Sequence, residues 1–321
     1  MTDLSIIIVS YKGWQRLHKC LDALVLFKGE NFRTEVIVVD NNSKDEAIFE
    51  TEKRYPQFRF IFNKINGGFA NGSNLGARNS SGEYLLFLNP DTVASEDAVG
   101  KLLEIAREQP AFTIVSCRQI NERGKESIAT GQFPAMINLT GFLRAVFGRR
   151  IAEPVSSGSD IIFPDWISGS VVLMRRTVFQ RLNGFDEDYW MYYEDVDLCK
   201  RNQNLDGKVA FCRSIAIEHN HGGSSRINLK TAALTKTEVL ISRHVYISKN
   251  KTGTERLLIQ IFLIINNLIN GVFTAVLGLI FFFIPKLFVR SVIYSRLVAY
   301  YISSLFRRSW ISPRSVNFRK I

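Results

Sequence analysis

The sequence predicts an α/β protein in which a mostly parallel sheet is flanked by helices and is followed by a C-terminal hydrophobic, basic helical region. Over residues 4–218, short apolar runs typical of strands buried on both faces alternate with amphipathic segments of helix length. Near the end of the chain, residues 257–285 contain no charged residue. We therefore expect an α/β domain at residues 1–250 and a membrane-associating helical region at residues 251–321.

Each element is predicted from its own local pattern. Apolar runs in β-α-β order at short spacing favour a parallel, Rossmann-like sheet. Apolar residues at helical spacing, such as Leu17, Leu21 and Leu24, predict helices. The expected strands are residues 4–9, 36–39, 58–62, 84–88, 114–117, 165–174 and 208–218, and the expected helices are residues 14–24, 69–79, 95–108 and a segment after Tyr193. Residues 118–164 lack a regular pattern and predict an irregular insert, either a lid or acceptor loop or a flexible connection.

Charge and cysteine content narrow the function classes. Residues 219–321 hold fifteen Lys and Arg against two acidic residues, so the net charge of +11 comes from this tail. A basic segment binds nucleic acid or an anionic membrane, and the apolar content of the tail favours the membrane and argues against nucleic acid. The four cysteines form no Cys-x-x-Cys pair, which indicates a reducing compartment without a zinc site. The first apolar run is too short for a signal peptide, so we expect the N-terminal part in the cytoplasm.

Two acidic residues stand at the ends of expected strands. Asp91 follows the run at 84–88, and Pro90 ends that strand because it cannot donate to a sheet ladder. Ligands of open α/β sheets bind at this edge, so Asp91 could hold a divalent cation, or it could cap the next helix. Asp40 ends the second strand and could accept hydrogen bonds from a base or a ribose. Its turn-like sequence, DNNSKD, favours the alternative of a cap or Asx-turn.

Residues 63–84 form a segment rich in Gly and Asn. Gly67 and Gly68 permit a tight turn, and the small residues that follow would let a helix pack closely on the sheet. The segment matches neither the phosphate-binding loop of NTPases nor a G-x-G-x-x-G pattern.

Residues 185–201 combine six acidic residues with several aromatic ones. Glu194 and Asp195 are expected in the first turn of a helix, where the helix dipole favours negative charge and a carboxylate could act as a general base. The alternative is a solvated, acidic helix start. The aromatic neighbours, among them Trp190, argue against full solvation because aromatic residues beside acids often line sugar sites.

Two histidines follow the strand expected at 208–218. His219 or His221 could complete a metal site or contact phosphate, and the alternative is a turn histidine without a ligand.

Taken in order, these motifs resemble the inverting nucleotide-sugar glycosyltransferases of family 2, which have the GT-A fold. Within that family the chain is most similar to the rhamnosyltransferase-like branch that builds bacterial surface polysaccharides. The resemblance covers about residues 4–250. It is carried by VSY at 9–11, VVDNNS at 38–43, NGGFANGSNLG at 66–76, GEYLLFLNPD at 82–91, WISGSVVLMRR at 166–176, FDEDYWMYYEDVDLCKR at 185–201 and HNHGGSS at 219–225.

The resemblance implies a donor and metal site. Asp40 would bind the base or ribose of the nucleotide-sugar donor, with Ser10 and Tyr11 beside it. Asp91 stands where the family's DxD motif ends and would hold Mg²⁺ or Mn²⁺ on the diphosphate, although the first acid of the motif is Asn89 here. The resemblance also implies that Asn66, Gly67 and Asn74 shape the donor pocket, and that His219 or His221 contacts the metal or the diphosphate.

The resemblance also implies a catalytic and acceptor site. Asp195 would be the catalytic base, and Glu194 would orient the acceptor or the base. Arg243, Tyr246 and Lys249, spaced as RxxYxxK, are similar to a basic patch for a phosphate group, with Trp190 on the acceptor side. The processive synthases of the family carry a QxxRW-like motif, which is absent after the ED helix here, so we expect transfer of one or a few sugars.

The tail leaves three membrane arrangements open. As one helix, residues 257–285 would extend about 43 Å, more than the roughly 30 Å hydrocarbon core of a bilayer. The flanking charges indicate no direction, so a spanning helix, a re-entrant hairpin and an in-plane helix all remain, as does a soluble hairpin or homodimer interface. Residues 287–306 suit an amphipathic interfacial helix. Because acceptors of such enzymes are usually lipid-linked, we expect a protein on the cytoplasmic face of the bacterial inner membrane.

Two other functions compete with this prediction. A sugar nucleotidyltransferase could use a similar sheet, but the chain lacks a GxGTR-type start after the first strand. A non-catalytic scaffold could keep the fold, but Asp91, Asp195 and the histidines are all present. The donor dTDP-rhamnose follows only from the branch that the chain resembles.

Overall fold

The structure, a computed structural model, describes residues 2–135, 159–220 and 228–318. They form two compact units. The sheet unit contains residues 1–66, 72–185 and 195–221, and the helical unit contains residues 67–71, 186–194 and 222–321. The domain boundary expected at residue 250 stays a prediction.

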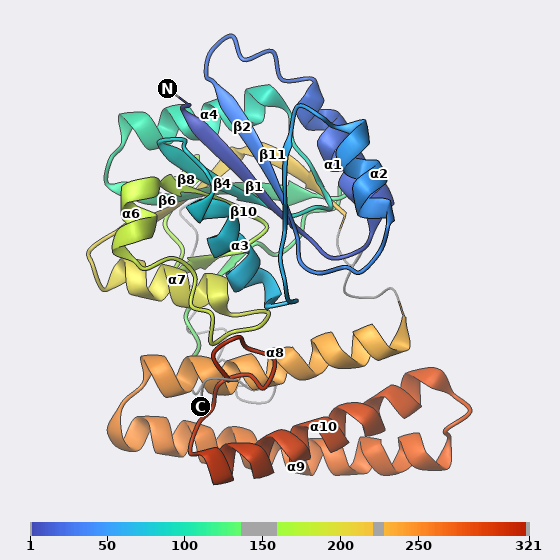
Figure 1. Ribbon diagram of the computed structural model, residues 1–321. Coiled ribbons are helices and arrows are strands. Elements are labelled where there is room, and N and C mark those ends of the chain that lie inside the picture. Colours follow the sequence, from blue (N-terminus) through green and yellow to red (C-terminus); the bar gives the residue numbers. More distant parts are fainter. Residues whose placement is uncertain (1, 136–158, 221–227, 319–321) are drawn as a thin grey trace. The chain divides into compact units, whose positions relative to one another are not determined.

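The main sheet of the described residues is mixed, and its first half is parallel (Figure 1). Its strand order is β3-β2-β1-β4-β10-β6-β11-β5, and β8 pairs with β11. Strands β3, β2, β1 and β4 run parallel, as do β6 and β11, whereas β10 lies antiparallel between β4 and β6. The strands are β1 Leu4–Ser10, β2 Thr34–Asp40, β3 Arg59–Phe62, β4 Tyr84–Leu88, β5 Thr92–Val93, β6 Phe112–Ile120, β8 Ile161–Ile162, β10 Val171–Arg175 and β11 Lys208–His219. The predicted α/β fold with its C-terminal helices is confirmed.

Successive residues of a strand point to opposite faces of the sheet, and in β1 and β4 the residues on both faces are buried. Helices therefore cover both faces. On one face, Ile6 and Leu86 belong to a core that includes buried residues of α1 (Trp14–Val25) and α4 (Glu96–Glu108). On the other face, Phe87 packs on Phe179 of α6 (Arg176–Arg181) and on Phe185, with ring centroids 5.0 and 4.9 Å away. Among the described residues, the other helices of this part of the chain are α2 Ala47–Arg54, α3 Gly68–Arg78 and α7 Glu194–Gln203.

Small residues bring α3 close to the sheet, as predicted. A Cβ atom on Gly72 would lie 2.6 Å from Cγ1 of Val9, and one on Gly76 would lie 2.5 Å from Cγ2 of Ile7. Both distances are far below ordinary carbon contacts, so only glycine permits this approach. The segment therefore positions backbone near the carboxyl end of β1, which places it at the ligand-binding edge of the sheet.

The prediction of a wholly irregular insert at 118–164 is wrong at its start. Strand β6 continues to Ile120, and Ile120 bridges Glu126 across a turn. Strand β7 (Thr130–Gly131) then pairs with β9 (Trp166–Ile167). The polar sequence hid this short pairing, because such pairing depends on a partner strand far along the chain. Strand β8, which pairs with β11, also falls within the predicted insert. Residues 136–158 of the insert lie outside the described residues.

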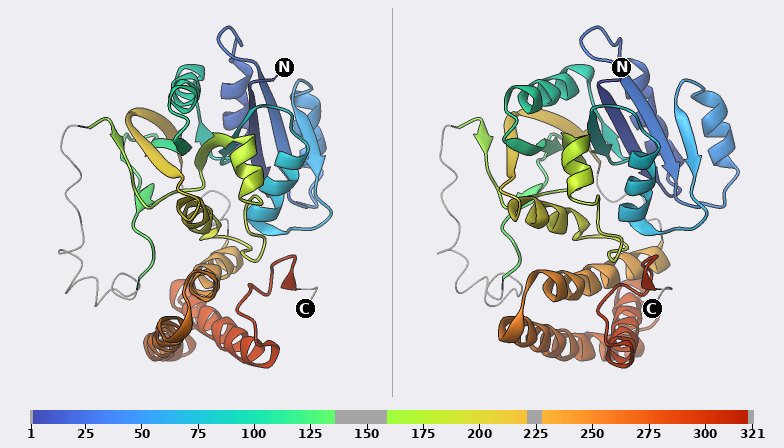
Figure 2. Two further views of the ribbon diagram at one scale, coloured as in Figure 1. Left: turned by 90° about the vertical axis from the view of Figure 1, so that its left-hand side faces the viewer. Right: turned by 60° about the vertical axis from the view of Figure 1, so that its left-hand side comes forward.

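The described part of the helical unit contains three long helices, α8 Leu229–Asn250, α9 Gly253–Ile280 and α10 Pro285–Arg307. Helices α9 and α10 form a hairpin around the turn at 281–284, where Pro285 begins α10 (Figure 2). Helix α9 therefore ends five residues before the end of the uncharged run at 257–285. Gly278 permits close packing, since a Cβ there would lie 2.3 Å from the carbonyl oxygen of Leu287. By length and composition, α9 alone among the described helices could cross a membrane, and only 17% of its most apolar window is buried.

Candidate active site

The carboxyl ends of β4 and β11 bring two predicted metal ligands together. Oδ1 of Asp91 lies 3.2 Å from Nε2 of His219, and their side chains are 10% and 3% exposed. Asp91 does not cap the next helix, because Ser95 does so by accepting a hydrogen bond from the Ala98 N–H. That alternative is therefore wrong. The other histidine candidate, His221, lies outside the described residues.

Gln119 fixes the orientation of the His219 ring. Its Oε1 lies 2.7 Å from Nδ1 of His219 and accepts a second hydrogen bond from the hydroxyl of Ser170, also at 2.7 Å. Because an amide oxygen can only accept, Nδ1 donates this hydrogen bond to Gln119, and the other ring nitrogen, Nε2, faces Asp91. Histidines that bind metals are held by their second nitrogen in this way. Gln119 falls inside the stretch that lacked a pattern, so sequence reasoning missed it.

This pair fits a six-coordinate divalent cation. Two ligand atoms at about 2.1 Å from Mg²⁺, at a right angle, lie about 3 Å apart, close to the separation of Asp91 Oδ1 and His219 Nε2. Within the described ranges, no cluster of three or more His, Cys, Asp or Glu side chains could hold a metal. The described residues would thus supply two ligands and leave positions for water and substrate oxygens, as Mg²⁺ sites commonly do.

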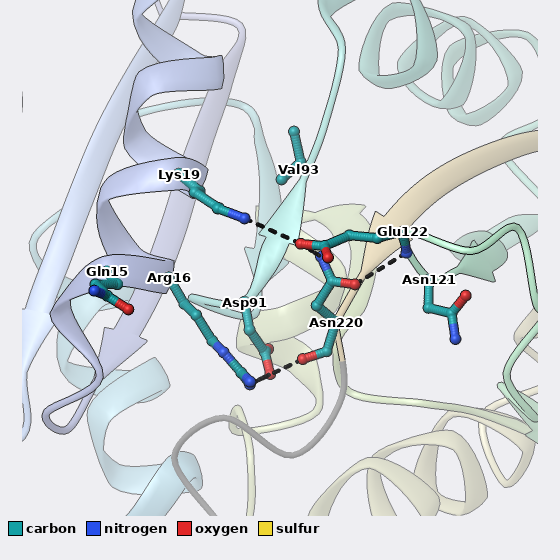
Figure 3. Close-up of a pocket in the computed structure, with 8 residues that line it drawn as sticks. All are labelled: Gln15, Arg16, Lys19, Asp91, Val93, Asn121, Glu122 and Asn220. Carbon is teal, nitrogen blue, oxygen red and sulfur yellow. Dashed lines mark hydrogen bonds and ion pairs between the residues drawn. The ribbon is translucent and has the colours of Figure 1, made fainter.

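A charged pocket opens beside Asp91 (Figure 3). Arg16 of α1 places Nη1 at 3.7 Å from Oδ2 of Asp91 and donates to the carbonyl oxygen of Asn220 at 3.0 Å. On the same helix, Lys19 pairs with Glu122 at 3.0 Å. The pocket measures roughly 400 Å³ and is lined by Gln15, Arg16, Lys19, Asp91, Val93, Asn121, Glu122 and Asn220. Sequence reasoning missed Arg16, because an arginine on the polar side of an amphipathic helix carries no signal of a binding role.

The loops after β1 and β2 are joined around Asp40. Its carboxylate oxygens accept hydrogen bonds from the Ser43 N–H, at 3.3 and 3.1 Å, and Ser43 Oγ accepts one from the Lys12 N–H at 3.0 Å. Asp40 therefore bonds backbone within its own turn, three residues on, which fits the expected alternative of a cap better than that of an Asx-turn. A carboxylate has about four acceptor sites, so the turn leaves capacity for a ligand. Ser10 is buried and Tyr11 is 39% exposed.

The other donor candidates of the sheet unit are held within amide networks. Oδ1 of Asn66 accepts from Asn41, at 3.2 Å. Asn74 is buried and clamps the backbone of Phe185, donating to its carbonyl at 2.8 Å and accepting from its N–H at 2.9 Å. Asn74 thus shapes the chain around it, and contact with a donor stays a prediction for both asparagines.

Asp195 begins α7 in an environment that suits a base. Its Oδ2 accepts a hydrogen bond from the Gly169 N–H at 2.8 Å, and its Oδ1 accepts one from the Val196 N–H, also at 2.8 Å. The surrounding protein atoms desolvate the side chain, and this effect raises the pKa of Asp195 above its ordinary value although both backbone N–H groups lower it. The alternative of a solvated, acidic helix start is wrong, because Glu194 and Asp197 of this turn are buried.

The backbone directly before this helix is strained. Tyr192 and Tyr193 have φ angles of +71° and +68°, a left-handed region that bulky residues rarely adopt. Such outliers cost of order 1–3 kcal/mol each and persist where the surrounding structure holds them, often at active sites.

The predicted acceptor residues lie in the helical unit. Arg243 donates from Nε to the hydroxyl of Tyr193 at 3.2 Å, and Tyr246 is buried beside that ring. Nζ of Lys249 lies 2.5 Å from carboxylate oxygens of both Asp186 and Asp188. Burial lowers the pKa of Lys249, but the two carboxylates outweigh it and the net shift is upward, so Lys249 is charged. A phosphate contact for these three residues stays a prediction.

Gly67 and Trp190 also belong to the helical unit, where they flank a close backbone contact. A Cβ on Gly68, whose φ is +84°, would lie 1.7 Å from the carbonyl oxygen of Trp190. That carbonyl accepts a hydrogen bond from the Phe69 N–H at 3.0 Å. Trp190 is 4% exposed, so its role toward an acceptor stays a prediction.

Comparisons with known proteins place these observations in a family context. The model of glycosyl transferase family 2 matches residues 5–163, and that of the N-terminal domain of galactosyltransferase matches residues 163–221. The low-salt glycan biosynthesis hexosyltransferase of Haloferax volcanii is 27% identical over 68% of this chain and 68% of its own length. For the rhamnosyltransferase WbbL of Escherichia coli the identity is 28%, over 61% of this chain and 75% of the relative. For the N-acetylglucosaminyl-diphospho-decaprenol L-rhamnosyltransferase of Mycobacterium tuberculosis it is 29%, over 70% and 78%.

Solved structures share the fold at low identity. GalNAc-T7 with UDP, GalNAc and Mn²⁺ has a TM-score of 0.55 and 16% identity, over 78% of this chain and 50% of that one. The mannosyltransferase of Pyrobaculum calidifontis, in complex with GDP-Man and Mn²⁺, has a TM-score of 0.54 and 14% identity, over 79% and 68%. These similarities concern the fold alone.

Proposed function

This chain belongs to glycosyl transferase family 2, in its rhamnosyltransferase-like branch, and from that premise we propose that it transfers one sugar from a nucleotide-sugar donor to a lipid-linked saccharide. It is a glycosyltransferase. The observation that carries the finer proposal is the convergence of Asp91 and His219, 3.2 Å apart, at the ligand-binding edge of the sheet. The relative from Mycobacterium tuberculosis, named for a diphospho-decaprenol substrate, supports a lipid-linked acceptor. The branch supports dTDP-rhamnose as the first donor to test.

The donor is held by its two ends in this proposal. Asp40, with Ser10 and Tyr11 beside it, accepts hydrogen bonds from the base or ribose. Asp91 and His219 hold a divalent cation, Mg²⁺ or Mn²⁺, whose charge stabilises the leaving diphosphate when it is bound. Arg16, beside Asp91, adds a fixed positive charge at the same place.

Asp195 is the base of the reaction. Its carboxylate takes the proton from an acceptor hydroxyl while that oxygen forms a bond to the anomeric carbon. The bond from this carbon to the diphosphate oxygen breaks on the opposite face, and its electron pair leaves with the nucleoside diphosphate. Configuration at the anomeric carbon is therefore inverted. Glu194 orients the acceptor.

A panel of nucleotide sugars tests the proposal. The purified full-length chain in detergent is incubated with each donor and a lipid-linked saccharide extract, with Mg²⁺, Mn²⁺ or EDTA. We expect release of one nucleoside diphosphate above background only with metal and acceptor, and a product of inverted configuration by NMR. A product that retains configuration would overturn the mechanism, and metal-independent transfer would overturn the roles of Asp91 and His219. Silence across all donors would favour a scaffold.

We further propose that the α9–α10 hairpin lies in the plane of an anionic membrane, on the cytoplasmic face. Exposed apolar side chains recur from Leu257 to Ile280 of α9 at intervals of three or four residues and continue into the turn at 281–284. Such a stripe fits the headgroup–acyl boundary along its length. Lys286 and Arg290 follow the turn at once, and an upright hairpin would carry these charges into the hydrocarbon.

The turn offers a sharp test of membrane binding. Phe282 and Phe283 are 68% and 67% exposed, and burial of each side chain contributes about 1.5–3 kcal/mol. The double change Phe282→Ser with Phe283→Ser is expected to weaken flotation with vesicles of 30 mol% phosphatidylserine at least tenfold. The control Phe163→Ser, at a phenylalanine 58% exposed in the sheet unit, should leave flotation unchanged. Equal flotation of both variants would contradict the proposal.

A further inference from the structure

After α10, the chain returns as a segment that we call the C-terminal strap, residues 309–318. Arg308, with a φ of +51°, ends the helix. The ring of Trp310 stacks on His244 of α8 at a centroid distance of 5.2 Å, and its carbonyl accepts a hydrogen bond from the hydroxyl of Tyr300 at 2.7 Å. Ser312 then donates to the buried carboxylate of Glu238 at 2.8 Å. The start of the strap is therefore anchored to α8 and α10, within the helical unit.

The rest of the strap contacts the acidic loop, residues 186–193. The hydroxyl of Ser315 donates to the carbonyl of Glu187 at 2.7 Å. Nδ2 of Asn317 donates to Oδ1 of Asp188 at 2.8 Å, and the N–H of Ser312 donates to the Asp188 carbonyl at 3.2 Å. These three hydrogen bonds join segments more than 120 residues apart in the chain.

An aromatic contact adds to these hydrogen bonds. The guanidinium of Arg314 lies 4.5 Å from the ring centroid of Trp190, in the same acidic loop. The electron-rich face of the ring attracts the cation, so this contact also holds the strap to the acidic loop.

Helix α8 also holds the acidic loop. Lys249 pairs with Asp186 and Asp188, and Ser242 donates to the carbonyl of Met191 at 2.9 Å. Asn71 adds a hydrogen bond to the carboxylate of Glu187 at 2.9 Å. The acidic loop is thus clamped from three segments, of which the strap comes last in sequence.

These contacts hold the acidic loop where its backbone is strained, at its C-terminal end. The left-handed Tyr192 and Tyr193 immediately precede Glu194 and the proposed base Asp195. A strained conformation relaxes unless neighbouring contacts over-determine it. Relaxation here would turn the start of α7 and shift the carboxylates that follow, and a displacement of about 1 Å can cost a hundredfold in rate.

We propose that the C-terminal strap is a positioning element for catalysis, in which Ser315 and Asn317 hold the acidic loop so that the first turn of α7 presents its carboxylates correctly. This inference rests on the proposed glycosyl transfer. It assigns a role in the reaction to residues beyond the region that resembles the family, and neither residue contacts substrate in this role.

The test combines hydrogen exchange with kinetics on the full-length chain. In the double variant Ser315→Ala with Asn317→Ala, we expect backbone amides of residues 186–193 to exchange at least tenfold faster. We also expect kcat for transfer to fall about tenfold while the donor KM stays within twofold, because the donor residues proposed above belong to the sheet unit. The control Ser295→Ala removes a hydroxyl that donates within its own helix, to Val292, and should change neither measurement.

Rescue and failure are both defined. Ser315→Thr keeps the hydroxyl and should retain wild-type exchange and kcat, which a merely destabilising site would not do. Unchanged exchange in the acidic loop of the double variant would overturn the proposal, as would a rise in donor KM with kcat unchanged. If the double variant does not fold, Asn317→Ala alone decides by the same two measurements. If the wild-type chain transfers no sugar, the glycosyl-transfer proposal fails. Hydrogen exchange still tests the strap in that case, because unchanged exchange of residues 186–193 in the double variant would show that the strap does not hold the acidic loop.

Discussion

Replacing Asp195 with Asn is expected to lower kcat by about 10²–10⁴, the range that general bases contribute. The amide has the same shape, and its single oxygen can still accept the hydrogen bond from the Gly169 N–H, whereas the bond from the Val196 N–H to the second oxygen is lost. Circular dichroism and thermal unfolding should confirm that the variant stays folded. It cannot take a proton from an acceptor hydroxyl. Nucleotide-sugar binding, measured by calorimetry, should stay within twofold of wild type. The control Asp206→Asn changes an exposed turn residue, with a φ of +58° that Asn tolerates, and should leave kcat unchanged.

The pH profile offers a second view of the same residue. A base works only in its ionised form, and burial raises the pKa of Asp195 above the ordinary value of 3.8. Activity should therefore be present above this raised pKa and should be lost as the pH falls through it. The acid limb of kcat/KM is accordingly expected at a higher pH than an exposed aspartate would produce. Turnover by Asp195→Asn within twofold of wild type would reject this residue as the base and transfer that role to Glu194.

Replacing Asp91 with Asn is expected to weaken Mn²⁺-dependent binding of the nucleoside diphosphate at least tenfold. The change removes the carboxylate charge and leaves an amide beside Nε2 of His219 and the guanidinium of Arg16. A neutral amide oxygen binds a divalent cation more weakly than a carboxylate does. Calorimetry with nucleoside diphosphate in Mn²⁺ and in EDTA measures the effect, and the wild-type and variant affinities should converge in EDTA.

Two further variants separate a metal site from a general loss of structure. His219→Ala should weaken nucleoside diphosphate binding in Mn²⁺ as much as Asp91→Asn does. Gln119→Leu frees the His219 ring to turn, so its affinity in Mn²⁺ should fall about 10- to 100-fold. His18→Ala, at a histidine that contacts Thr51 instead, serves as the control. Equal nucleotide affinity with and without metal in the wild-type chain would exclude Asp91 and His219 as metal ligands.

Local patterns account for what could be predicted. The run Tyr84–Leu88 is buried along its length in β4, and the break at Pro90 delivers Asp91 to the edge of the sheet, as expected. The Glu194–Asp195 pair likewise begins α7. Such features are readable because burial periodicity, turn chemistry and helix starts depend on neighbouring residues.

Contacts over long sequence distances account for the rest. Gln119 and His219 are 100 residues apart, and Arg16 and Asn220 are 204 residues apart. Before the strands are placed, nothing distinguishes Gln119 from any glutamine in a polar segment. The antiparallel position of β10 between β4 and β6 could not be predicted from the sequence either, since an apolar strand has the same residue pattern in either direction.

The amino-acid sequence alone determined the class of fold, the strand ends that carry Asp40, Asp91 and His219, and the helix that begins at Glu194. Only the tertiary structure decided which side chain orients His219 and which segment holds the acidic loop. The physical reason is that hydrophobic periodicity is encoded residue by residue along the chain. A hydrogen bond such as that from Ser315 to Glu187 exists only after folding has joined two distant segments.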